Sequence, residues 1–178
     1  KIRQVLPFEI EPTLPFPIEE VVMDFQPVRQ ADQTDIIACA IRSSDLTCIV
    51  DVLKSRDMDP QAVTTGGLPT ALCLARFANI SPQFIFMDIG RNCCTLFAIV
   101  SGQIHLVRTF QINATSSSDH TTDIIIRQLV QFMAAFEAFY DFGFEPSTLC
   151  ISGEGIDTDI FKQKLESFMR LTVRPVNI

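Results

Sequence analysis

The sequence is poor in basic residues and in histidine. Its 178 residues include 14 lysines and arginines against 21 acidic residues, a formal net charge of −7, and only two histidines. A protein that binds a nucleic-acid backbone carries a basic surface, so this balance argues against a nucleic-acid partner and favours a basic protein partner. With two histidines, His105 and His120, no zinc site is expected.

Long hydrophobic runs and paired cysteine motifs are also missing. The longest apolar stretch, 84–100, is interrupted by Asp88 and Arg91, so it falls short of the roughly 20 apolar residues that a spanning helix needs. No secretory signal opens the chain, which favours the cytosol. There the cysteines are expected to be reduced, buried and to act as small hydrophobic side chains. They are Cys39, Cys48, Cys73, Cys93, Cys94 and Cys150.

Catalytic constellations are not evident. Serine, histidine and aspartate occur together only at 116–120, a contiguous loop that cannot supply the separated geometry of a catalytic triad. Glu19 and Glu20 are adjacent, which does not suit a paired-carboxylate hydrolase. The sequence therefore predicts a protein that is not an enzyme.

The first part of the chain alternates prolines, strands and helices. Four prolines before Glu19 predict a short broken helix over 1–14 and an extended connector. Residue spacing then predicts strands at 21–28 and 36–41, a serine-capped helix at 46–56, a strand at 61–64 and a helix at 68–78.

The second part begins with three apolar segments in 84–112, which are separated by Asp-Ile-Gly and Ser-Gly turns and predict a three-strand meander. A long helix at 121–142 follows, with Phe132, Phe136 and Phe139 as expected core residues. A strand at 147–152, a helix at 158–169 and a strand at 171–176 complete an α/β chain. This alternation predicts a mixed sheet covered by helices.

Two turns are candidate nucleotide-binding sites. Asp88 could act through magnesium-bound water, while the turn at Gly90 and Asn92 could present backbone amides to a phosphate. Gly153 and Gly155, after the later strand, would let a phosphate or purine lie close. The alternative is purely structural: a hairpin whose polar side chains satisfy local amides, and a strand-to-helix turn that needs small residues.

The proline-rich entry is a candidate partner surface. Its acidic residues are Glu9, Glu11, Glu19 and Glu20. Phe8, Phe16 and Ile18 lie among the prolines, and we expect Phe16 and Ile18 to fold back onto the small subdomain.

The segment LPFPIEEV at 14–21, followed by Asp24, Phe25 and Gln26, resembles the PilM proteins of type IV pilus assembly and the cytoplasmic domain of the type II secretion L protein. The resemblance continues through the Asp88 meander to the turn at 152–155. It implies an actin-like ATPase fold, with a ribonuclease-H-like mixed sheet and a small α/β extra subdomain. The implied parts are residues 1–60 (extra subdomain), 61–81 (connecting strand and helix) and 82–178 (ribonuclease-H-like half).

Departures from the family pattern bear on nucleotide binding. Family members begin with another phosphate hairpin that this chain lacks, so we expect an incomplete piece of a longer actin-like protein. Arg91 to Cys94 replace small residues, and Glu154 would bring a carboxylate near a polyanionic nucleotide. The expectation is that ATP and magnesium binding is weak or absent and that no cofactor is held.

The resemblance implies a non-enzymatic scaffold in a type II secretion or type IV pilus platform, at the cytoplasmic face of the bacterial inner membrane. Its expected partners are the secretion or pilus ATPase and inner-membrane platform proteins, with a homodimer left open and no membrane contact by the fragment itself. The alternative is an ATP-binding actin-like protein whose nucleotide state regulates assembly.

Overall fold

A computed structural model describes residues 2–29, 34–112, 118–141, 143–153, 158–169 and 171–176. The chain divides into two compact units, residues 1–63 (unit 1) and residues 64–178 (unit 2). No helix among the described residues is both long enough and apolar enough to cross a membrane.

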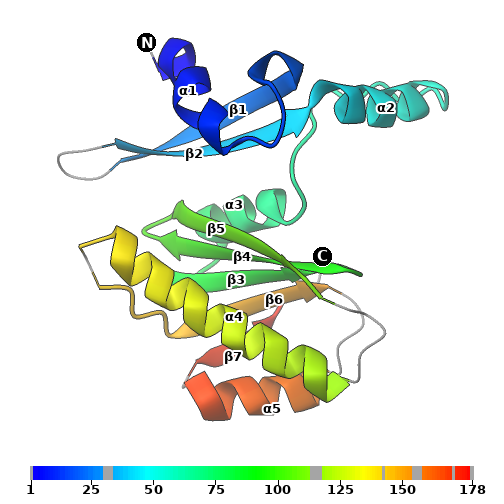
Figure 1. The fold of residues 1–178 in the computed structure, drawn as a ribbon. Coiled ribbons are helices and arrows are strands. Elements are labelled where there is room, and N and C mark those ends of the chain that lie inside the picture. Colours follow the sequence, from blue (N-terminus) through cyan, green and yellow to red (C-terminus); the bar gives the residue numbers. More distant parts are fainter. Residues whose placement is uncertain are drawn as a thin grey trace. The chain divides into compact units, whose positions relative to one another are not determined.

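Unit 1 is built on a two-stranded antiparallel sheet. Strands β1 (Val21–Arg29) and β2 (Thr34–Arg42) pair along their whole length. Before them come helix α1 (Ile2–Ile10) and the short 3-10 helices η1 (Glu11–Thr13) and η2 (Ile18–Glu20), and after them comes α2 (Ser43–Lys54), as Figure 1 shows. The broken first helix and both predicted strands are confirmed.

Arg42 holds the proline-rich entry against the hairpin. Its guanidinium lies 4.8 Å from the centre of the Phe16 ring, and its Nε lies 3.5 Å from a carboxylate oxygen of Glu20. Phe16 and Ile18 are half-buried. The expectation that Phe16 and Ile18 fold back onto the small subdomain is confirmed.

Two local predictions near the end of unit 1 are wrong. Residues 61–64 form no strand, and no described strand lies alongside them to supply hydrogen bonds. Helix α2 has no serine cap, because β2 continues to Arg42 and the helix begins at Ser43 itself, so Arg42 occupies the capping position without a side-chain hydrogen bond.

Unit 2 contains a mixed five-stranded sheet in the order β5-β4-β3-β6-β7. The meander β3 (Gln83–Ile89), β4 (Cys93–Val100) and β5 (Gln103–Gln111) is antiparallel, as its two short turns require. Strands β6 (Thr148–Gly153) and β7 (Thr172–Pro175) then add in parallel to β3 and to each other.

Helices cover both faces of this sheet. In Figure 1, α4 (Ser118–Phe139) and α5 (Thr158–Met169) cover one face of the sheet. Helix α3 (Leu68–Phe77) contacts β4 and β5, and its first turn touches Phe97, whose side chain points away from the α4 face. The predicted mixed sheet covered by helices is therefore confirmed.

The main core lies between the sheet and helices α4 and α5. Phe132 and Phe136 are buried in it, as predicted, but Phe139 is 73% exposed and that prediction is wrong. The buried stripe of α4 continues four residues beyond Phe136 to Tyr140, whose hydroxyl donates to the carbonyl oxygen of His105 at 2.7 Å. Tyr140 therefore takes the core position and Phe139 points outward.

The prediction of buried cysteines is wrong for four of the six. Only Cys94 and Cys150, on central strands of unit 2, are buried, and none of the six is paired. The exposed ones are Cys39 on β2, Cys48 on α2, Cys73 on α3 and Cys93 at the start of β4. The difference in burial between the adjacent Cys93 and Cys94 shows that they point to opposite faces of β4.

Candidate functional site

The two predicted nucleotide-binding turns meet at one edge of the sheet. Because β3 and β6 are parallel neighbours, their carboxyl ends lie together, with Asp88 opposite Ser152 and Ile89 opposite Gly153. The fold thus joins segments that are more than 60 residues apart in the sequence. Gly155 lies outside the described residues.

The Asp88 carboxylate is engaged by Ser152. The Ser152 hydroxyl donates to Oδ1 of Asp88 at 2.6 Å, a length typical of a hydrogen bond to an ionised carboxylate. Ser152 is 5% exposed and Asp88 is half-buried. This bond ties β6 to β3 at the point where both strands end.

The second oxygen of Asp88 faces the start of α3. A Cβ built on Gly67 would lie 2.8 Å from Oδ2 of Asp88 and 2.9 Å from the Phe97 ring. Gly67 also has φ +73°, a conformation that suits glycine. The Gly67 backbone therefore packs directly against the Asp88 carboxylate, where any side chain would collide with it.

Hydroxyl groups extend this arrangement across the sheet. Thr95 on β4 lies opposite Asp88, and Thr109 on β5 lies opposite Thr95, with 3.0 Å between the two threonine Oγ1 atoms. Residues directly opposite each other share a face. Asp88, Thr95, Thr109 and Ser152 consequently form one polar row on the face that α3 touches.

Two glycines of the candidate site, Gly90 and Gly153, have structural roles. The Gly90 N–H donates to the Cys93 carbonyl oxygen at 2.8 Å and closes the β3-β4 turn. Gly153 has φ +124°, and a Cβ there would lie 2.0 Å from the Ile89 carbonyl oxygen, so only glycine permits this approach of β6 to β3.

Asn92 contributes its backbone to the meander. Its carbonyl oxygen accepts a hydrogen bond from the Ile112 N–H at 2.9 Å, which fixes the end of β5 beside the turn. Of the backbone amides that were expected to face a phosphate, the Gly90 N–H is therefore used within the turn, whereas the Asn92 bond engages only its carbonyl oxygen.

Three site residues were missed by the sequence reasoning. Thr95 and Thr109 could have been found by counting outward from the two turns of the meander, because antiparallel register fixes which residues lie opposite. Gly67 could not, since it approaches Asp88 only through the packing of α3 on the sheet.

The buried thiol of Cys94, next to the site, is not reactive. Burial raises the pKa of Cys94 far above its usual range, and the negative charge of Asp88 raises it further. A protonated thiol is a poor nucleophile and a poor metal ligand. Within the described ranges, no group of three histidine, cysteine, aspartate or glutamate side chains could hold a metal ion.

The predicted partner-binding glutamates lie on the entry of unit 1. Glu9 is in α1, Glu11 in η1, and Glu19 and Glu20 in η2, and all four are exposed. Of the four, Glu20 forms an ion pair, with Arg42, whereas no ion pair is found for the other three within the described part of the chain.

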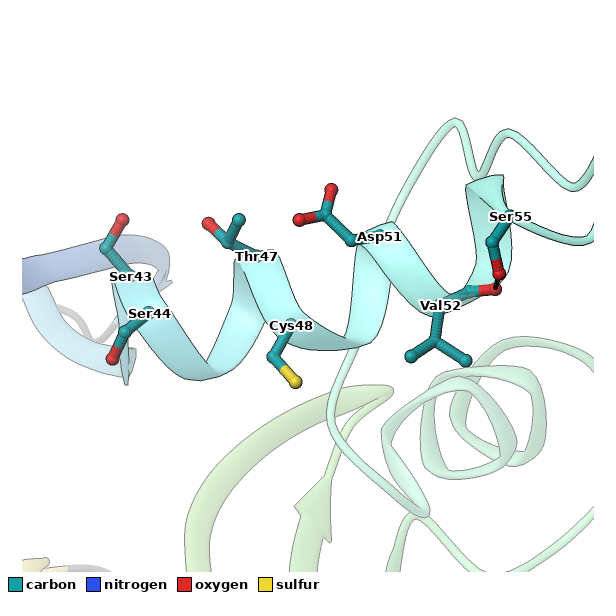
Figure 2. A pocket seen from close by; sticks show the side chains of 7 residues that line it. All are labelled: Ser43, Ser44, Thr47, Cys48, Asp51, Val52 and Ser55. Carbon is teal, nitrogen blue, oxygen red and sulfur yellow. Dashed lines mark hydrogen bonds between the residues drawn. The ribbon is translucent and has the colours of Figure 1, made fainter.

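A shallow hollow of about 700 Å³ runs along α2. Figure 2 shows its side chains on one helix and its C-terminal turn, with Thr47 and Asp51 on one side and Cys48 and Val52 on another. They do not converge on a common point. This hollow therefore lacks the geometry of a catalytic pocket.

The fold is that of the actin-like ATPases. A Bacteroides thetaiotaomicron protein described as having an actin-like ATPase fold and unknown function matches with a TM-score of 0.57 and 12% identity, over 98% of this chain and 60% of that one. The predicted fold class is thereby confirmed.

Two further matches agree with the resemblance seen in the sequence. A chain of the PilM–PilN type IV pilus biogenesis complex has a TM-score of 0.69 and 19% identity, over 99% of this chain and 62% of that one. The cytoplasmic domain of EpsL, an inner-membrane component of the Vibrio cholerae type II secretion system, has a TM-score of 0.53 and 11% identity, over 99% and 59%. The chain thus spans about three fifths of each of these three structures. No family model and no curated protein match the sequence.

Proposed function

We propose that this chain is the actin-like scaffold part of a type IV pilus or type II secretion platform, and that it works by docking other components rather than by catalysis. The observation that carries the proposal is the alignment of 99% of the chain with a single chain of the PilM–PilN complex at a TM-score of 0.69. Both units of the chain therefore have counterparts in one pilus component.

The names of the two relatives suggest the partners. One is a complex of PilM with PilN, and the other is a component of a secretion system of the inner membrane. By this analogy, the partners of the present chain are a PilN-like platform protein and the pilus or secretion ATPase, and its place is the cytoplasmic face of the inner membrane.

The geometry at Asp88 favours docking over nucleotide turnover. One carboxylate oxygen accepts the Ser152 hydroxyl, the other packs against Gly67, and the Gly90 N–H is bonded to Cys93. These are the groups that would have to face magnesium and phosphate. Each of these groups already has a partner within the fold, which supports docking over the binding of magnesium-ATP.

The polar row supports one second candidate, an ATP-binding actin-like protein whose nucleotide state regulates assembly. Three hydroxyl groups beside a carboxylate, on the face of the sheet that α3 touches, could take part in binding a phosphate if Ser152 released Asp88. The two candidates differ in whether the Asp88 carboxylate only holds β6 to β3 or takes part in nucleotide binding.

The docking proposal is tested with the full-length protein and the purified PilN counterpart of the same organism. We expect a stable complex in size-exclusion chromatography, whereas no association with either the PilN counterpart or the platform ATPase would refute the proposal. Calorimetric titration with magnesium-ATP separates the candidates. Micromolar binding, about −8 kcal/mol, would favour the regulated ATP-binding protein.

A further inference from the structure

Helix α1 turns an apolar stripe away from the rest of unit 1. Ile2, Val5 and Phe8 follow one another at intervals of three residues and are 40%, 53% and 73% exposed. Residues three apart are neighbours on a helix surface. Leu6, which borders this stripe four residues after Ile2, is buried. The stripe is therefore a continuous apolar surface rather than a set of scattered residues.

The helix is held so that this stripe stays outward. Arg3 pairs with Asp24 at 3.5 Å and lies over the Phe25 ring at 5.9 Å, so this side of α1 contacts strand β1. Leu6 packs inward on the same side of the helix as Arg3. Rotating α1 to cover Phe8 would break these contacts and expose Leu6.

Negative charge borders the stripe. Glu9 lies four residues after Val5 on the same side of α1, and Glu11 follows in η1. Neither glutamate is in an ion pair with any described residue. Unit 1 as a whole carries eleven acidic and six basic side chains, net −5 of the −7 of the chain.

We propose that the stripe of Ile2, Val5 and Phe8, with Glu9 and Glu11, is the docking surface for a segment of the platform partner in which apolar side chains are flanked by lysine or arginine. This inference rests on the proposed docking function. Apolar anchors provide most of the affinity of such contacts, while complementary charge speeds association and selects the partner. The same surface has the wrong charge for a second copy of this chain.

The test compares Val5→Ala/Phe8→Ala with Val130→Ala/Phe139→Ala in the full-length protein. The control pair lies on α4, where Val130 is 44% and Phe139 73% exposed, so both variants remove similar exposed groups. We expect the α1 variant to weaken binding of the purified PilN counterpart about tenfold or more, and the α4 variant to leave it within about twofold.

The role of the negative charge is tested with Glu9→Gln/Glu11→Gln. The control variant is Glu137→Gln/Glu145→Gln, which removes the charge of two exposed glutamates of unit 2. Only the first variant should slow association at low salt, and the difference should disappear at high salt. Hydrogen exchange in the unmodified protein should show protection of α1 amides upon binding. Because this measurement uses no variant, a folding defect caused by a substitution cannot account for its result.

Three results would overturn the inference. If the unmodified protein binds the PilN counterpart and Val5→Ala/Phe8→Ala binds equally well, the surface is wrong and the docking function stands. If the unmodified protein binds neither the PilN counterpart nor the platform ATPase, the proposed function fails together with the inference. If sedimentation shows self-association that Val5→Ala/Phe8→Ala abolishes, the occupant is a second copy of the chain.

Discussion

Replacing Gly67 with alanine should destabilise unit 2, whereas the same change at the adjacent Gly66 should not. At the φ of +73° of Gly67, an L side chain costs about 1–2 kcal/mol. The new Cβ would also lie under 3 Å from Asp88 and from the Phe97 ring. A Cβ on Gly66 would meet its nearest neighbour, Oδ2 of Asp88, at 4.0 Å, an ordinary contact.

The collision at Gly67 cannot be relieved cheaply. Phe97 is fully buried and its ring is stacked on Phe86 at 5.6 Å, and Asp88 is bonded to Ser152. Overpacking of a buried site costs about 1–3 kcal/mol. Together with the backbone cost, Gly67→Ala should lower the free energy of unfolding by about 2–5 kcal/mol. The expected cost for Gly66→Ala is below about 1 kcal/mol.

Tyr140 provides the assay. It is the one tyrosine in a sequence without tryptophan, and it is buried in the core of unit 2, so tyrosine fluorescence follows the unfolding of that unit alone. With a urea dependence of about 1–3 kcal/mol per molar, Gly67→Ala should lower the urea midpoint by about 0.7 M or more. Midpoints for the two glycine variants that agree within about 0.3 M would refute the packing of α3 on Asp88.

Three further predictions concern single side chains. Ser152→Ala removes the donor to the carboxylate of the polar row and should cost about 1–3 kcal/mol in the same urea assay, and an unchanged midpoint would contradict the bond. Burial raises the pKa of Cys150 to about 11, so at pH 8 about one thiol in a thousand is ionised and native labelling should stop at four cysteines. The labelling rate of Cys150 should then rise about tenfold per pH unit. Six fast-reacting thiols at pH 8 would be inconsistent with this burial. Glu19→Lys should leave stability unchanged and weaken partner binding at low salt, whereas Glu20→Lys should also cost up to about 1 kcal/mol because it faces Arg42; equal thermal stability of the two would show that the pair contributes nothing.

The sheet was predictable because its signals are local. Short turns at Asp-Ile-Gly and Ser-Gly force adjacent strands to pair, and alternation within 93–100 assigns each side chain to a face. Cys94 is accordingly buried and Cys93 exposed. The parallel addition of β6 follows from the long helix that must carry the chain back across the sheet.

The failures have a common physical origin in tertiary packing. Phe139 and Tyr140 both continue the spacing of Phe132 and Phe136 along α4. Tyr140 is the buried one, with its ring 4.5 Å from the Phe136 ring and its hydroxyl bonded to the His105 carbonyl oxygen. Likewise, apolar segments around cysteines indicate burial only when a second layer covers them. In unit 1 that layer is thin, since Leu6 and Val28 are its only fully buried apolar side chains among the described residues.

This contrast between the units determines where substitutions can separate an effect on binding from an effect on stability. In unit 2 the candidate site is interwoven with the fold, because Asp88, Gly67 and Gly153 each hold strands or helices together. Substitutions there will change stability whether or not a nucleotide binds, so loss of function alone cannot identify a ligand. In unit 1 the stripe on α1 and its glutamates are exposed, so changes there should alter binding with little change in stability. A partner defect without a change in unfolding therefore distinguishes a docking surface from a structural one, and α1 is the part of this chain where that distinction can be measured.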